Sequence, residues 1–271
     1  MTRRWSIPLS ILVLTFGSML AGATAATAST TAHLGHPAHA HGFIPGGLMQ
    51  RPTSGPTSRV VDGKYQDESS NWSGYAVTGG TYSSVSANWT QPTASCTSRS
   101  DLYAAFWVGL DGFNSDSVEQ TGSDSDCVGR TPSYYGWYEM YPADPVYYNN
   151  PVSPGDSMSA SVTFSGSDTY TLVLTDHTQN WTQRQVINES GFSRSSAEVI
   201  TEAPCCTNSG GILPLADFHT INYTSSSDNG SSMGGQSPTS IIMVDTSGRQ
   251  EDSTSSMTSG GNFSNTWIRS N

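Results

Sequence analysis

Residues 158–164 read Met-Ser-Ala-Ser-Val-Thr-Phe, a strict alternation of apolar and small polar side chains. Successive side chains of an extended strand point to opposite faces, so this pattern predicts a strand with one buried face. The same alternation occurs in residues 85–90, 137–141, 170–174 and 218–223, and residues 240–244 and 263–268 resemble late strands. These runs predict a protein built almost entirely of β-strands.

Clusters of Gly, Ser, Thr, Asn and Pro separate the strand-like runs, and no amphipathic helix longer than two turns stands out. Many antiparallel strands with one buried face each favour a β-sandwich. The 271 residues suffice for one large all-β domain, and 7 Trp, 12 Tyr and 8 Phe supply core material that disordered chains lack.

The N-terminus has the features of an export signal. Arg3 and Arg4 precede a mostly apolar stretch over residues 5–20, followed by small residues over 21–28. We therefore predict a signal peptide at 1–28, a pro-segment or linker at 29–66, and the folded domain at 67–271. The protein is expected to be secreted and extracellular, and no later segment is apolar enough to span a membrane. Thr2-Arg3-Arg4 weakly resembles a twin-arginine signal, so the export route stays open.

Charge is distributed unevenly along the chain. The formal net charge is −11, and from Tyr65 onward 6 arginines face 21 acidic residues. Such a domain repels nucleic acid and anionic membranes, so we expect neither as a partner. The segment before Tyr65 is basic, which suggests that it docks electrostatically on the acidic domain and is loosened by acid. Equal processing rates at neutral and acidic pH would count against that hypothesis.

The four cysteines are expected to form disulfides in an exported protein. They are Cys96, Cys127, Cys205 and Cys206, and they allow three pairings. We favour Cys96 with Cys127, which leaves the adjacent Cys205 and Cys206 as a strained vicinal pair, although pairing of each with a distant cysteine stays open. No C-x-x-C or nearby histidine pattern supports a zinc site, and no metal is expected.

Familiar catalytic signatures are missing from the sequence. There is no H-E-x-x-H and no G-x-S-x-G. Outside the N-terminal tract the histidines are His177 and His219, so a Ser-His-Asp triad is possible with either, but nothing marks a nucleophilic serine. The remaining candidate chemistry is that of carboxylates.

Two acids stand on one face of the predicted strand at residues 197–202. Glu198 and Glu202 flank Ile200 at alternate positions, and burying them would be costly without a purpose. The alternative is a strand that exposes both acids and buries Ala197 and Val199. Alternation alone does not decide between these interpretations, nor between the two acids.

Two further segments contain polar groups of interest. Gln120 precedes a Thr-Gly turn, and a glutamine amide can donate to a developing oxyanion without titrating, although a lone glutamine there is usually structural. The aromatic run Trp-Tyr-Glu-Met-Tyr-Pro at 137–142 suggests either the floor of a substrate cleft or simply core.

Taken together, these segments resemble the glutamic peptidase (eqolisin) family. The matching motifs occur in the family's order: Asn-Trp-Ser-Gly at 71–74, VSANWTQP at 85–92, WVGLDG at 107–112, QTG at 120–122, WYEMYP at 137–142, PGD at 154–156 and AEVITE at 197–202. Each motif is short, but their shared order makes chance agreement improbable. The resemblance spans residues 70–271.

The resemblance implies a concanavalin A-like sandwich of two antiparallel sheets with a catalytic pair on the concave face. It assigns the pair to Gln120 and Glu202, with no cofactor. It also implies that six residues line or support the cleft: Trp72, Trp107, Asp111, Asp124, Glu139 and Tyr141. Met140, where the family more often has Trp, and the divergent stretch 142–151 leave the side-chain specificity open.

The implied activity is a secreted acid endopeptidase that acts on proteins or peptides, as a monomer. Ionised Glu202 would take a proton from the attacking water, and the Gln120 amide would stabilise the oxyanion. The ordinary carboxyl pKa of about 4.3 suggests activity in acid. Two alternatives are a glycoside hydrolase that uses two carboxylates, and a non-catalytic carbohydrate-binding sandwich with an aromatic platform.

Overall fold

The computed structural model describes residues 47–52, 57–61, 64–205 and 211–270. All of them belong to one compact unit spanning residues 36–271. The predicted signal peptide, the histidines before position 42 and Cys206 lie outside the described residues. Within them, the single helical element is the short 3₁₀ turn η1 (Met233–Gly235). No helix in this part of the chain is both long and apolar enough to cross a bilayer.

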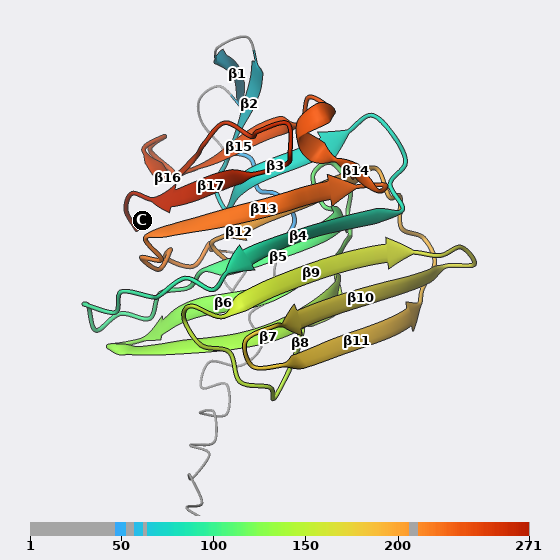
Figure 1. Ribbon diagram of the computed structural model, residues 1–271. Helices are drawn as coiled ribbons and strands as arrows, with labels where there is room; N and C mark the ends of the chain where they lie inside the picture. Colours follow the sequence, from blue (N-terminus) through green and yellow to red (C-terminus); the bar gives the residue numbers. More distant parts are fainter. Residues whose placement is uncertain (1–46, 53–56, 62–63, 206–210, 271) are drawn as a thin grey trace, which may run out of the picture. The chain divides into compact units, whose positions relative to one another are not determined.

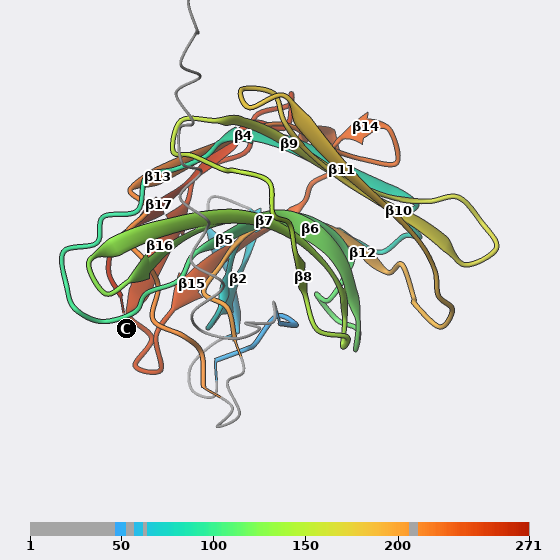
Figure 2. The same cartoon turned by 90° about the horizontal axis from the view of Figure 1, so that it is seen from below.

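Two curved layers of strands lie face to face (Figures 1 and 2). The first layer bears the candidate site, and all its pairings are antiparallel except β15 with β2. Its order is β8 (Val146–Tyr147), β7 (Thr131–Tyr141), β6 (Val118–Val128), β5 (Ala105–Asp111), β12 (Ser196–Glu202), β3 (Trp72–Thr78), β15 (Thr239–Val244), β2 (Lys64–Ser69) and β1 (Ser58–Val61).

The second layer is antiparallel throughout. Its order is β11 (Trp181–Asn188), β10 (Thr169–Asp176), β9 (Ser157–Phe164), β4 (Ser84–Thr90), β13 (Thr220–Asp228) and β17 (Phe263–Trp267). Strand β16 (Gln250–Thr254) pairs with both β15 and β17 and so joins the two layers at one side. The two-residue strand β14 (Ser231–Ser232) forms a hairpin with β13.

Alternation along each strand sorts the side chains onto two faces. Phe106, Val108 and Leu110 of β5 enter the core between the layers, together with Val199 of β12 and Val162 of β9. The other face of the first layer carries a separate apolar cluster around Trp72, Trp107, Trp137 and Ile200. Both faces of the first layer are therefore buried, which explains why β5 and β12 are buried at every position.

The predicted all-β sandwich is confirmed, and the alternating runs are strands. Residues 85–90 lie in β4 and residues 158–164 lie in β9, with their apolar members buried except for the half-buried Phe164. The late runs are β15 and β17. The sequence did not reveal that β1 and β2, which fall in or across the predicted pro-segment, pair with each other and that β2 extends the first layer through β15.

The favoured disulfide is present between Cys96 and Cys127, with Cα atoms 5.4 Å apart. It ties the segment after β4 to the end of β6, near the isolated bridge between Leu102 and Cys127. Cys205 is buried and disulfide-bonded. The adjacent pairing with Cys206 stays a prediction.

Several acidic side chains are buried inside this fold. Glu119 of β6 lies opposite Leu110 and Met140, in the core between the layers, and is fully buried. Neither carboxyl oxygen of Glu119 has a hydrogen-bond partner among the described residues. Burial, with a further contribution from the charge of Asp111, raises the pKa of Glu119 to about 9. Glu119 is therefore a neutral acid in the folded protein over the acidic and neutral range.

This burial predicts a stability that declines as the pH rises. Between the unfolded pKa near 4.5 and the folded pKa near 9, only the unfolded chain ionises at Glu119, so increasing pH favours unfolding. Glu119→Gln removes this titration, and we expect the difference in Tm between pH 4 and pH 8 to shrink by several degrees. Thermal unfolding at a series of pH values measures this difference.

The matched control is Asp144→Asn, because Asp144 is exposed. Its pH dependence should follow that of the unaltered protein. An equally steep decline in Tm with pH for Glu119→Gln would contradict the assignment of a neutral Glu119.

Candidate active site

The second face of the first layer collects the predicted site residues from five neighbouring strands, β3, β12, β5, β6 and β7. Directly paired residues share a face, and the register places Trp72, Glu202, Ala105, Asp124 and Tyr135 in one row. The next row contains Ile200, Trp107, Gly122 and Trp137, and a third contains Glu198, Gly109, Gln120 and Glu139. Figure 2 shows that this face lies on the inner side of the curved layer.

Glu202 is fully buried, and three N–H groups point at its carboxyl group. Oε1 accepts from the Gly47 backbone N–H at 2.9 Å and from Asn71 Nδ2 at 3.2 Å. Oε2 accepts from Trp107 Nε1 at 2.9 Å. Donors on both oxygens are the arrangement that a carboxylate requires, because an ionised carboxyl only accepts.

Burial and hydrogen bonding act on Glu202 in opposite directions. Burial is the larger effect and raises the pKa of Glu202 to about 8, while the donors from Gly47, Trp107 and Asn71 lower it. A carboxyl group whose pKa is displaced toward neutrality by its surroundings is typical of a functional site.

Two glycines make room for the Trp107 indole beside Glu202. A Cβ atom on Gly122 would lie 2.6 Å from the Trp107 Cβ and 2.2 Å from the Phe106 carbonyl oxygen. One on Gly109 would lie 2.8 Å from Trp107 Cζ3. Since real Cβ atoms do not approach so closely, the glycines let the indole lie along the sheet with its N–H at Glu202. The Trp72 ring packs edge-on against it, with ring centroids 4.9 Å apart.

Gln120 is fully buried on the same face and is oriented by Glu139 of β7. Gln120 Nε2 donates to Glu139 Oε2 at 2.6 Å. Gln120 Oε1 has no hydrogen-bond partner among the described residues. The amide therefore keeps one N–H and its carbonyl oxygen available for another group.

Gln120 and Glu202 lie diagonally across β5, and no hydrogen bond between them occurs in the described part of the chain. They stand on strands two spacings apart, about 10 Å, and four residues apart along the strands, about 13 Å in a flat sheet. The layer is curved, so the separation in the folded sheet differs from that in a flat one (Figure 2).

The structure separates Glu202 from Glu198, which alternation could not. Glu198 stands in the row of Gln120, with Gly109 between them. However, neither Glu198 oxygen has a hydrogen-bond partner among the described residues, and burial raises its pKa well above the ordinary value. Glu198 is thus held as a neutral acid, whereas Glu202 has donors for an ionised one. The expectation that these acids face solvent is excluded, since both are fully buried.

Asp124 belongs to a buried polar network on β6 and β7. Its Oδ1 accepts from Trp137 Nε1 at 2.5 Å, and two residues along β6 Asp126 accepts from the Tyr135 hydroxyl and from the Ala104 N–H. Burial raises the pKa of Asp124, and the nearby charges of Asp126 and Glu202 add to this effect. Asp124 thus positions Trp137 on the site face.

The other predicted supporting residues have distinct places. Trp72 is fully buried, and its Nε1 donates to the Gly47 carbonyl at 3.1 Å. Asp111 accepts from the backbone N–H groups of Arg194 and Ser195, so it anchors the loop that leads into β12. Tyr141 is half-buried at the end of β7 and packs against the apolar cluster of the site face.

Asn71 is a site residue that the sequence reasoning did not select. It belongs to the Asn-Trp-Ser-Gly motif and to an N-x-S sequon, yet its side chain is fully buried against Glu202. A folded chain presents no surface for a glycan there. The signal available in the sequence is its place directly before the buried Trp72 in the opening motif.

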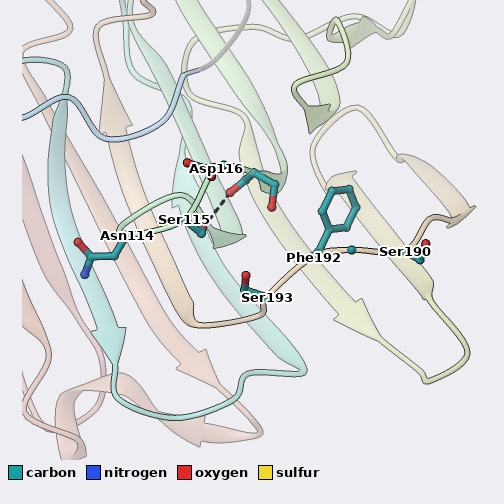
Figure 3. A pocket seen from close by; sticks show the side chains of 8 residues that line it. Asn114, Ser115, Asp116, Ser190, Phe192 and Ser193 are labelled. Atoms are coloured by element: carbon teal, nitrogen blue, oxygen red, sulfur yellow. Dashed lines mark hydrogen bonds between the residues drawn. The ribbon is translucent and has the colours of Figure 1, made fainter.

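A hollow of about 410 Å³ lies beside the start of β6 (Figure 3). Its lining comes from the loop before β6 and the loop before β12: Asn114, Ser115, Asp116, Ser117, Ser190, Gly191, Phe192 and Ser193. None of the predicted site residues lines it. Within the described residues no three His, Cys, Asp or Glu side chains are grouped so as to hold a metal ion.

The site face of this β-sandwich thus combines a buried carboxyl group, that of Glu202, with a buried carboxamide, that of Gln120. The profile of the Peptidase A4 family matches residues 70–267. The chain therefore belongs to the Peptidase A4 family, the glutamic peptidases or eqolisins.

Individual relatives agree with this membership. Scytalidopepsin B of Scytalidium lignicola is 31% identical over 170 residues, which is 62% of this chain and 59% of the relative's length. Aspergillopepsin-2 of Aspergillus niger is 27% identical over 208 residues, covering 68% and 73% of the two chains. A crystal structure of scytalido-glutamic peptidase with a transition state analog inhibitor superposes with a TM-score of 0.64 at 26% identity, covering 73% of this chain and 98% of that one.

Trp107→Phe tests the electrostatic part of this description. It keeps an aromatic ring but removes the N–H donor to Glu202 Oε2, so we expect the pKa of Glu202 to rise further. Carboxyl ¹³C NMR across a pH series on the full chain measures that pKa. A hydrogen bond to a charged group is worth about 1.5–3 kcal/mol, which corresponds to a rise of about one to two units.

Trp181→Phe is the control, because the Trp181 indole donates to the Pro151 carbonyl, remote from Glu202. The Glu202 titration should be unaltered in that variant. An unchanged or lowered pKa in Trp107→Phe would show that the indole does not stabilise the carboxylate.

Proposed function

We propose that this protein is a secreted endopeptidase that hydrolyses peptide bonds with Glu202 as general base and Gln120 as oxyanion stabiliser. The observation that carries the proposal is a buried carboxyl group with N–H donors on both oxygens, on the same sheet face as a buried amide with unused hydrogen-bonding capacity. The related scytalido-glutamic peptidase has been crystallised with a peptide based transition state analog, which supports a peptide substrate for this chain as well.

In the first step, ionised Glu202 accepts a proton from a water molecule as that water attacks the peptide carbonyl carbon. General-base catalysis of this kind contributes roughly 10²–10⁴-fold to a rate. Trp107 and Asn71 hold the carboxylate in position, so the oxygens need not reorganise as the proton moves. The buried surroundings strengthen each of these interactions relative to water.

Gln120 acts on the carbonyl oxygen of the peptide bond and helps to hold the attacking water. With one N–H held by Glu139, the remaining N–H can donate to the oxyanion and the carbonyl oxygen can accept from the attacking water. One donor to an oxyanion is worth about 2.7–4 kcal/mol in other hydrolases. Glu202, now protonated, then returns its proton to the leaving amine, which completes hydrolysis without a cofactor.

The pH range follows from the state of Glu202. A base must be ionised, so a pKa near 8 leaves Glu202 largely protonated and ineffective in acid. Gly47, whose N–H donates to Glu202, belongs to the segment before β1. When processing removes that segment, water reaches the carboxyl group, its desolvation decreases, and the pKa of Glu202 moves toward the ordinary value of about 4.3. We therefore expect activity in acid only after the segment that contains Gly47 has left Glu202.

A glycosidase is less well supported by the geometry. Glu198 and Glu202 stand four residues apart on one strand, about 13 Å, whereas paired glycosidase carboxylates are about 5–10 Å apart. Membership of the Peptidase A4 family also favours hydrolysis of peptide bonds over that of glycosidic bonds.

Single substitutions of the pair test the proposal. Gln120→Ala should lower kcat by about 10²–10³-fold through loss of the oxyanion donor, and Glu202→Gln should lower it by at least a comparable factor through loss of the base. Cleavage of casein and of a fluorogenic peptide by processed enzyme in acid measures both.

Gln179→Ala and Glu189→Gln are matched controls, because both residues are exposed on the second layer, away from the site. They should keep full activity. Near-native turnover by either site variant, with an unaltered Tm, would refute the assigned roles.

A further inference from the structure

The hollow beside the start of β6 lies between two loops that continue into the strands of the candidate site. In Figure 3, Asn114, Ser115 and Asp116 come from the loop that leads into β6, whereas Phe192 and Ser193 come from the loop that leads into β12. Its volume of about 410 Å³ falls within the range that is typical of ligand pockets. The hollow is therefore large enough to hold one long amino-acid side chain.

Both loops are fixed to the ends of the strands by polar side chains. Asp111, the last residue of β5, accepts hydrogen bonds from the backbone N–H groups of Arg194 at 2.5 Å and Ser195 at 2.8 Å. In the other loop, the Ser115 hydroxyl donates to the Ser117 carbonyl at 3.2 Å. The walls of the hollow are thus held in place by the sheet before any ligand binds.

The lining combines a carboxyl group, several hydroxyl groups and one aromatic ring. Asp116 is exposed, and no ion pair of Asp116 occurs among the described residues. The hydroxyls of Ser190 and Ser193 likewise form no hydrogen bond within the described part of the chain. Phe192 is half-buried, and its ring packs edge-on against Tyr170 with ring centroids 5.5 Å apart. The hollow therefore offers acceptors for N–H groups beside a fixed apolar wall.

Two arginines lie beside the hollow, and both are engaged with groups other than its carboxyl. The Arg194 guanidinium lies over the Phe164 ring of the second layer, 3.9 Å from the ring centroid. Arg51 forms an ion pair with Asp67 at 3.1 Å, and its second terminal nitrogen donates to Asn114 Oδ1 at 3.3 Å. The rim of the hollow thus already accepts an N–H group from a basic side chain.

The hollow lies within a few residues of the proposed catalytic pair. Ser117 precedes Gln120 by three residues, which corresponds to about 10 Å of extended chain. On the same sheet face, Gly47 contacts Glu202 and Arg51 contacts the rim, so four residues of chain span the interval. A substrate peptide held at the pair therefore places the side chain of its third or fourth residue beside the hollow.

We propose that this hollow is a subsite that binds a basic side chain of the peptide substrate, three or four residues from the bond that is cut. The inference rests on the proposed function of Gln120 and Glu202. The charged head group of Lys or Arg lies at Asp116 and donates to the Ser193 hydroxyl, while its methylene chain packs against Phe192. Substrates are then selected by charge at a position remote from the reacting carbonyl.

The test uses processed enzyme and a series of fluorogenic peptides in which a single lysine is moved along the chain. Each peptide is compared with one that has norleucine at the same position, because norleucine keeps the hydrocarbon chain without the charge. The assay is run at about pH 5, above the ordinary aspartate pKa of about 3.9. We expect kcat/KM to be about three- to fivefold higher for lysine at one position, three or four residues from the scissile bond. Asp116→Asn should bring this ratio close to one.

Further variants separate the charge of Asp116 from its shape. Asp116→Glu keeps the charge and should keep the preference for lysine, whereas Asp116→Lys should reverse it and favour glutamate over glutamine at that position. Asp217→Asn is the matched control, because Asp217 adjoins Phe218, which packs on Phe106 at the other end of β5 from Asp111. Its ratio for lysine over norleucine should equal that of the unaltered enzyme.

Equal kcat/KM for lysine and norleucine at every position, or a lysine preference that survives in Asp116→Asn, would overturn the subsite. Peptide binding to Glu202→Gln distinguishes this failure from failure of the proposed function. If lysine peptides bind that variant with a Kd three- to fivefold below that of the norleucine peptides, but processed, unaltered enzyme cuts none of them, the subsite stands and the proposed function is wrong.

Discussion

The buried carboxyl group of Glu202 is the feature on which the organisation of this molecule depends. A carboxylate removed from water is strongly disfavoured unless donors replace its hydration. Here the Trp107 indole of β5, the Asn71 side-chain amide just before β3 and the Gly47 backbone N–H replace it. The first layer must be assembled in its native register before any two of them reach the same carboxyl group.

The rest of the fold keeps that register and shapes the space around it. The core between the layers fixes β5 and β12 through alternate residues, which leaves the intervening positions free to face the cleft. Gly109 and Gly122 give the Trp107 indole its room, and Asp124 holds Trp137 at the next strand. Several of the buried acids have raised pKa values because of burial, so the folded state is one that tolerates acid better than alkali.

The strands were largely predictable, whereas the site was predictable only in part. Val85, Ala87 and Trp89 alternate with polar residues because every second side chain of a strand points into the core. The sequence therefore predicted β4 directly. Gln120 and Glu202 could be selected through resemblance, but their diagonal placement depends on strand pairing across β5, which no local pattern reveals. Asn71 and Gly47 form hydrogen bonds with Glu202 although they lie 131 and 155 residues away from it in the sequence. Contacts between such distant residues produce no periodic pattern, so the sequence did not indicate the position of either residue.

The central claim is that Gln120 and Glu202 act together on one reacting carbonyl. The most direct test is kcat/KM of processed enzyme carrying Gln120→Ala and Glu202→Gln together, compared with each single variant under identical conditions. Groups that act as a unit are strongly non-additive. We therefore expect the double variant to be about as slow as the slower single variant. Losses that multiply, as for two independent residues, would contradict joint action of the pair.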